Sequence, residues 1–207
     1  MGIAMTIIGM HLSPGGKSAL AWCDSEFYRN GAPGGHTQKM AINPLLGVVI
    51  VGAGTAYTNE IAAELLRAAF NLEKLLCDLS KDFRGLESGS TSARHAGSCL
   101  AVAGWSHALK RIVGFTISSK SDFAPQPAST FSLPAITDFG FLHPETAEDV
   151  VGTTQAQMRE IRKIYPSAGA GMLTVAEIRP DAITVRPMYD LGRGEFLRAP
   201  LEFRSAA

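Results

Sequence analysis

The stretch TIIGMHLSPGGKSALAW, residues 6–22, decides the fold. Two largely apolar runs, residues 6–10 and 18–22, flank the turn Ser13-Pro14-Gly15-Gly16. A Pro-Gly-Gly turn between apolar runs predicts a β-hairpin. Because strands that arrive in hairpins form antiparallel sheets, we expect this stretch to begin one.

The rest of the chain groups its strands and helices in the same way. Helical spacing of apolar residues predicts three helices, at residues 55–69, 72–84 and 147–161. Strands are predicted at residues 47–51, 99–103, 111–117, 172–178 and 182–186. The last two are split by the turn Arg179-Pro180-Asp181, which predicts a second hairpin. This order predicts an α+β fold, a four-layer αββα sandwich with two antiparallel sheets between helix layers. We expect the first two helices to lie side by side on one outer face, and residues 1–207 to form a single domain.

Composition excludes several classes of function. The chain has 19 basic and 19 acidic residues, a net charge of zero, which argues against a nucleic-acid partner. No apolar run reaches membrane-spanning length, and no secretory signal is visible. The three cysteines predict no disulfide framework and favour a cytoplasmic protein, with Cys23 a core thiol beside acidic Asp24. The scattered histidines indicate no metal, and we expect no cofactor.

The stretch Val49–Ala56 also looks like the start of a dinucleotide-binding loop, because Gly52 and Gly54 have the required spacing. The third glycine of such a loop is replaced by bulky Tyr57. The acidic ribose ligand would fall at Asp78, inside a predicted helix. These departures favour a tight strand-to-helix turn without a nucleotide.

Several pieces of the chain, in order, resemble the proteasome β-subunit family and, within it, the bacterial HslV-type threonine peptidases. They are Thr6-Ile7-Ile8-Gly9, Ala21-Trp22-Cys23-Asp24-Ser25, Lys39-Met40-Ala41-Ile42, Gly52-Ala53-Gly54-Thr55-Ala56, residues 72–84 and Ser167-Ala168-Gly169-Ala170-Gly171. The order and spacing agree over residues 5–84 and 165–187. The resemblance implies the fold of N-terminal-nucleophile hydrolases and peptide-bond hydrolysis inside a homo-oligomeric ring, with an ATPase as a further partner.

The resemblance also implies roles for individual residues. Thr6 would be the nucleophile, with its own α-amine as the base. Asp24 and Lys39 would form a charge pair beside it, and we expect them within salt-bridge distance where Thr6 emerges from the sandwich. The remaining site residues would be the oxyanion donors Gly52 and Gly54 and the serine Ser167.

The sequence departs from the family pattern at several positions. Thr6 aligns either with the nucleophile or with the residue after it, which would place Met5 at the catalytic position. No glycine precedes Thr6, and Tyr165-Pro166 stand where the family has an aspartate. Residues 1–5 would be a propeptide, a misplaced start or a cloning remnant; translation from Met5 would expose Thr6 directly. Two hypotheses follow: an active threonine hydrolase, or a catalytically silent subunit with an assembly or binding role.

Overall fold

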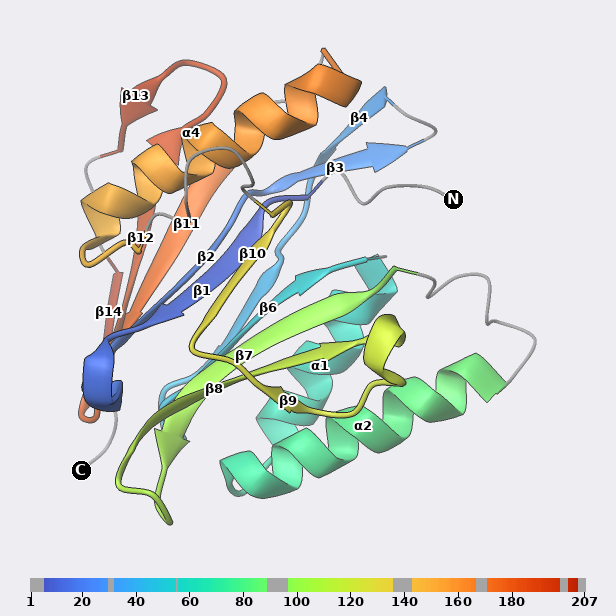
Figure 1. Ribbon diagram of the computed structural model, residues 1–207, viewed down its shortest axis with the longest axis vertical. Coiled ribbons are helices and arrows are strands. Elements are labelled where there is room, and N and C mark those ends of the chain that lie inside the picture. Colours follow the sequence, from blue (N-terminus) through green and yellow to red (C-terminus); the bar gives the residue numbers. More distant parts are fainter. Residues whose placement is uncertain are drawn as a thin grey trace.

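The structure is a computed structural model that describes residues 6–29, 32–54, 56–88, 97–135, 143–166, 171–197 and 201–204. Its described part is a mixed α+β fold with two antiparallel sheets and three helices (Figure 1). None of these helices is long and apolar enough to cross a lipid bilayer.

The first sheet has the strand order β10-β1-β2-β11-β12-β13, with β14 also paired to β12. Its strands are β1 (Ile8–Leu12), β2 (Ala19–Cys23), β10 (Thr130–Leu133), β11 (Met172–Ile178), β12 (Ala182–Asp190), β13 (Glu195–Phe196) and β14 (Leu201–Arg204). The predicted hairpin is confirmed, because β1 and β2 pair antiparallel around the short 3-10 helix η1 (Pro14–Gly16). The predicted hairpin at the other end of the chain is confirmed as β11 and β12.

The second sheet has the order β5-β6-β7-β8-β9. Its strands are β5 (Met40–Asn43), β6 (Val48–Ala53), β7 (Cys99–Ser106), β8 (Arg111–Ser118) and β9 (Gln126–Pro127). Every residue of β6 is buried, as its apolar sequence predicts for a strand covered on both faces. A separate two-stranded ribbon, β3 (Glu26–Arg29) with β4 (Ala32–His36), connects β2 to the second sheet.

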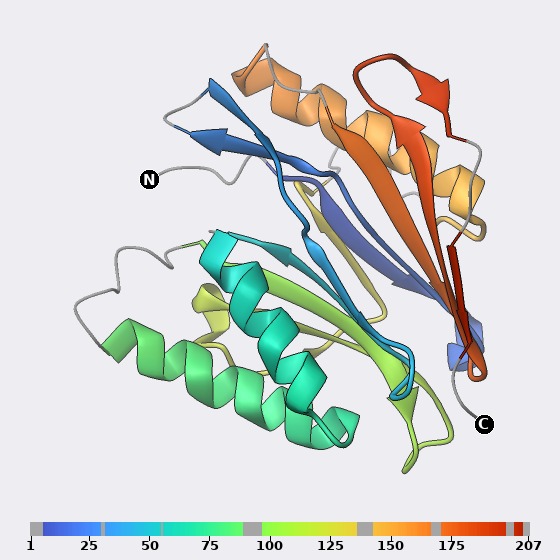
Figure 2. The same ribbon diagram turned by 180° about the vertical axis from the view of Figure 1, so that it is seen from behind.

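The helices cover the outer faces of the two sheets (Figures 1 and 2). Helix α4 (Ala147–Ile164) packs on the first sheet, and its residues share an apolar cluster with Ile7 and with residues of β2, β11 and β12. Helices α1 (Ala56–Ala68) and α2 (Leu72–Ser88) lie side by side on the second sheet, as predicted. A third apolar cluster fills the space between the sheets. The layer order is therefore helix, sheet, sheet, helices.

A buried polar contact fixes α4 on the first sheet. Trp22 donates its indole N–H to the side-chain oxygen of Gln157 at 3.0 Å. The amide nitrogen of Gln157 donates to the carbonyl oxygens of Ile8 at 3.2 Å and Leu133 at 3.0 Å. Because a buried amide is costly when unpaired, these bonds orient the helix over the end of the sheet nearest Thr6, where β1 begins and β2 and β10 end.

Two glycine substitutions test this packing. A Cβ added at Gly9 would lie 2.0 Å from the ring of Trp22, so we expect Gly9→Ala to lower the free energy of unfolding by about 3 kcal/mol or more. Gly152 lies exposed within α4 with open space around its Cα, so Gly152→Ala should raise it by about 0.5–1 kcal/mol. Urea denaturation of both variants measures the difference. Equal stability of Gly9→Ala and the parent would contradict the packing of Trp22 against β1.

Candidate active site

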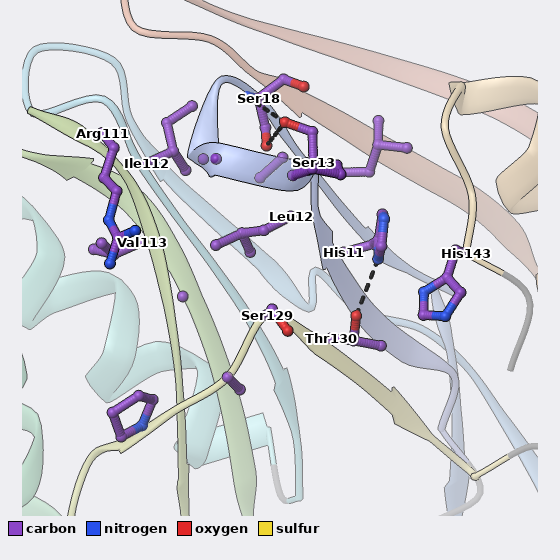
Figure 3. A pocket seen from close by; sticks show the side chains of 18 of the residues that line it. His11, Leu12, Ser13, Ser18, Arg111, Ile112, Val113, Ser129, Thr130 and His143 are labelled. Atoms are coloured by element: carbon purple, nitrogen blue, oxygen red, sulfur yellow. Dashed lines mark hydrogen bonds between the residues drawn. The ribbon is translucent and has the colours of Figure 1, made fainter.

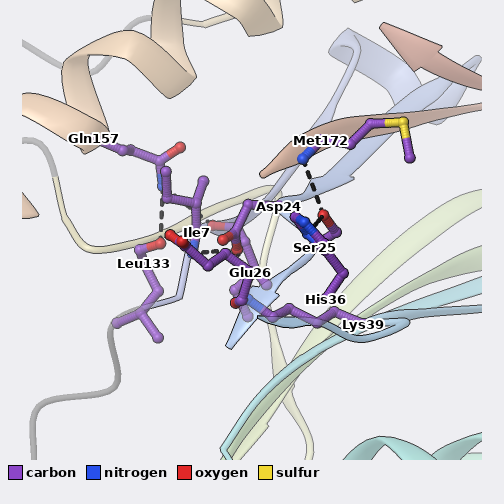
Figure 4. Close-up of polar contacts among 10 residues, drawn as sticks. Ile7, Asp24, Ser25, Glu26, His36, Lys39, Leu133, Gln157 and Met172 are labelled. Atoms are coloured by element: carbon purple, nitrogen blue, oxygen red, sulfur yellow. Dashed lines mark hydrogen bonds and ion pairs between the residues drawn. The ribbon is translucent and has the colours of Figure 1, made fainter. Parts of the chain in front are cut away.

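The ion pair expected between Asp24 and Lys39 is confirmed (Figure 4). Lys39 Nζ lies 2.7 Å from Asp24 Oδ1, and both residues are almost completely buried. Asp24 directly follows β2, and Lys39 directly precedes β5, so the first and second sheets each position one partner. The ammonium group of Lys39 also donates to the carbonyl oxygen of Glu26.

Thr6 lies close to this pair in space, because the residue after it contacts Asp24. The backbone N–H of Ile7 donates to Asp24 Oδ1 at 2.9 Å, and the N–H of Asp24 donates to the carbonyl of Ile7 at 3.0 Å. One peptide bond joins Ile7 to Thr6, so Thr6 Cα is no more than about 8 Å from Lys39 Nζ. Thr6 is itself only 7% exposed. The structure therefore brings Thr6, Asp24 and Lys39 together, 33 positions apart at most in the chain.

Burial governs the electrostatics of the pair. Removal from water raises the pKa of Asp24, and the Lys39 ammonium and the Ile7 N–H oppose this rise. The nearby carboxyl of Glu26 adds to it. Replacing a buried ion pair by apolar side chains of similar volume often costs no stability. The burial of Asp24 and Lys39 is therefore weak evidence that the pair serves to stabilise the fold. Its position beside Thr6 is compatible with a chemical one.

Cys23 behaves as the predicted core thiol. It is buried in β2, and burial together with the neighbouring Asp24 raises its pKa to about 12. A thiol with this pKa is almost entirely protonated at neutral pH, so it is a poor nucleophile. The burial of Cys23 and its raised pKa therefore favour a structural role for this residue.

The two glycines expected to donate to an oxyanion have close packing of their own. The N–H of Gly52 donates to the carbonyl of Lys39 at 2.9 Å, so it already has an acceptor. A Cβ at Gly52 would meet the side chain of Asn59 at 2.1 Å. Gly54 has a φ of +144° and lies against Ser98 and Thr58. These contacts explain both glycines as a tight strand-to-helix turn, and the antiparallel second sheet does not have the parallel strands of a dinucleotide-binding fold.

The position expected for the serine, Ser167, lies outside the described residues. The chain that follows it reaches the site: the N–H of Met172 donates to Ser25 Oγ at 2.9 Å. Gly171 packs against the backbone of Glu26, where a Cβ would come within 3.2 Å. The start of β11 is therefore held one residue away from Asp24.

Sequence reasoning missed three residues around the pair: Ser25, Glu26 and His36. Ser25 Oγ is hydrogen-bonded to His36 Nδ1 at 2.9 Å as well as to Met172 (Figure 4). Glu26 is only 3% exposed, and its carbonyl accepts from Lys39. Asp24 and Glu26 are two positions apart, and alternate side chains of an extended chain point to the same side. This spacing indicates that the two carboxyl groups lie on one side of the chain. Nothing in the sequence indicates the contact of Ser25 with β11.

Comparison with protein-family models finds no match for this chain, and a search of curated proteins finds none either. In the part of the chain that the structure describes, no group of three or more His, Cys, Asp or Glu side chains is placed to hold a metal ion.

Proposed function

We propose that this protein is an N-terminal-nucleophile amide hydrolase of the proteasome β-subunit and HslV type, with Thr6 as its nucleophile. The observation that carries the proposal is the shared acceptor at Asp24: one carboxylate oxygen binds both the Ile7 N–H and the Lys39 ammonium. The order of helix and sheet layers supports the same assignment.

The proposed chemistry needs a free α-amine on Thr6. The amine takes the proton of Thr6 Oγ as the oxygen attacks an amide carbonyl, and an ester to Thr6 forms. That proton passes to the leaving amine, and water then hydrolyses the ester. The Lys39 ammonium, held by Asp24, lowers the pKa of the hydroxyl and of the amine through its positive charge. Lys39 Nζ lies no more than about 8 Å from Thr6 Cα, a distance shorter than the Debye length of about 10 Å at 0.1 M salt.

A second candidate is a silent subunit of the same fold with an assembly role. The bond from the Gly52 N–H to Lys39 favours it, because one expected oxyanion donor is already occupied. Assembly into a homo-oligomeric ring is part of both candidates. Phe70 is 85% exposed and Leu45 is 74% exposed, and burying such side chains between subunits would be favourable. The native mass, measured by light scattering, tests whether a ring forms. The mass of a monomer would contradict the ring.

The hydrolase proposal is tested with protein that begins at Thr6, released from an N-terminal fusion. We expect such protein to hydrolyse fluorogenic peptide amides, and Thr6→Ala to reduce the rate to background because the nucleophile is absent. Thr6→Ser is the matched control, since it keeps the hydroxyl and should retain measurable hydrolysis. Equal rates for Thr6→Ala and the parent would exclude Thr6 as the nucleophile; no hydrolysis by any of them would favour the silent subunit.

A further inference from the structure

A large cavity lies away from the Asp24–Lys39 pair, at the other end of β1. Its volume is about 1070 Å³, at the upper end of what small-molecule sites have. It is lined from His11 to Gly16 on one side and by residues 111–115 of β8 on the other, so both sheets contribute (Figure 3). Leu12 is five residues from Ile7, roughly 17 Å along an extended strand. The cavity is therefore separate from the proposed active site.

Backbone hydrogen bonds hold the walls of this cavity in place. Where the chain crosses from the second sheet to the first, the N–H of Ala128 donates to Gly114 and the N–H of Leu12 donates to Ser129. Gly114 is required at this crossing, because a Cβ there would lie 2.4 Å from the carbonyl oxygen of Ala128. Such walls are formed before a ligand arrives, which lowers the entropic cost of binding.

The side chains divide the cavity into a cationic end and an aromatic end (Figure 3). Arg111 stands at one end, exposed, and forms no ion pair with any residue that the structure describes. The rings of His11 and His143 stand at the other end, 5.1 Å apart. Leu12, which is half-buried, lies between the two ends (Figure 3).

Charge directs a ligand within this cavity. Burial and the neighbouring His143 lower the pKa of His11, which disfavours its positively charged form. Glu145 lines the same end and acts on His11 through its negative charge, which disfavours an anion there. A carboxylate is therefore favoured at Arg111, whose planar guanidinium matches it with two parallel hydrogen bonds.

From this arrangement we propose that the cavity binds a small monocarboxylate with an apolar, ring-bearing body. The carboxylate contacts Arg111, the body lies along Leu12, and the ring packs on His11 and His143. Aromatic rings stack favourably at the separation of these two histidines, so a third ring extends an existing contact. This site and its ligand are independent of the hydrolase proposal.

Three probes test the proposal on the full chain: 4-phenylbutyrate, 4-phenylbutanol and 4-phenylbutylamine. They share a phenyl ring on a four-carbon chain and differ only in the polar group at its end. Calorimetry should show saturable binding of the carboxylate, at least about tenfold tighter than binding of the alcohol or the amine. The alcohol lacks the negative charge and the second parallel hydrogen bond, and the ammonium group of the amine is repelled by the guanidinium. Arg111→Gln should remove this tenfold preference. Lys110→Gln is the matched control, since it removes a neighbouring positive charge that does not line the cavity, and should keep the preference.

Backbone NMR locates the binding. Shifts at Leu12 and Gly114 on adding 4-phenylbutyrate, with Ile7 unchanged, are the expected result, and Thr6→Ala should bind the probe as the parent does. Equal affinity for the three probes, an unchanged preference in Arg111→Gln with folded-state spectra intact, or no saturable binding at millimolar concentration would each overturn the proposal.

Discussion

Lys39→Met is expected to lower the free energy of unfolding by about 3–5 kcal/mol and to reduce peptide hydrolysis to background. The ammonium lies 2.7 Å from Asp24 Oδ1 in a site almost closed to water, so its removal leaves a buried carboxylate without its counter-charge. The same change removes the charge that is proposed to act on Thr6. Urea denaturation and a fluorogenic assay on protein that begins at Thr6 measure the two losses.

A double variant separates these two roles. Asp24→Asn combined with Lys39→Met removes both charges and keeps a side-chain oxygen that can accept from the Ile7 N–H. We expect its stability to return to within about 1–2 kcal/mol of the parent, because no unpaired charge is left buried. Its hydrolysis should stay at background. A double variant that hydrolyses peptides at the parental rate would show that the pair serves only the fold.

Residues 1–5 are expected to suppress hydrolysis when they remain attached to Thr6. An amide nitrogen has no basic lone pair, so the extended protein lacks the proposed general base. The loss of a general base typically costs about 10²–10⁴-fold in rate. The rates of protein that begins at Met1 and protein that begins at Thr6, compared at equal concentration, measure this factor. Protein that begins at Thr6 and is then acetylated at its α-amine is the control, and it should be as slow as the extended form.

If the extended and the Thr6-initiated proteins hydrolyse the peptide equally fast, the α-amine is not the base. An unchanged rate after acetylation of the α-amine would lead to the same conclusion. Ser25 and His36, which are hydrogen-bonded to each other beside the Asp24–Lys39 pair, would then be the next residues to test as the base.

Much of the fold follows from local signals in the sequence. The Pro-Gly-Gly turn at residues 14–16 specifies the first hairpin, and Arg179-Pro180-Asp181 specifies the hairpin of β11 and β12. Apolar spacing predicts all three described helices, although α2 and α4 extend a few residues beyond the predicted ends. These features depend on residues that are close together in the chain, so they can be predicted from the sequence.

The parts that sequence reasoning missed depend on contacts between distant residues. Gln157 is a polar residue on a helix, and only the packed structure shows it bonded to Trp22 and to two strands. Asp24 and Lys39 are identified in the sequence through a resemblance, and their burial is a property of the assembled sheets. The cavity beside Arg111 arises where β8 faces β1, and no local pattern encodes that proximity.

The proposed function rests on Thr6 acting as a nucleophile with its own amine. A peptide epoxyketone tests this most directly, because its ketone and epoxide carbons react together with a hydroxyl and an amine on adjacent carbons. Intact mass spectrometry of Thr6-initiated protein should show an increase by the full mass of one probe, located to Thr6 by peptide mapping. Thr6→Ala and protein that retains residues 1–5 should show no increase. No adduct on folded Thr6-initiated protein, or an adduct that persists in Thr6→Ala, would contradict the account.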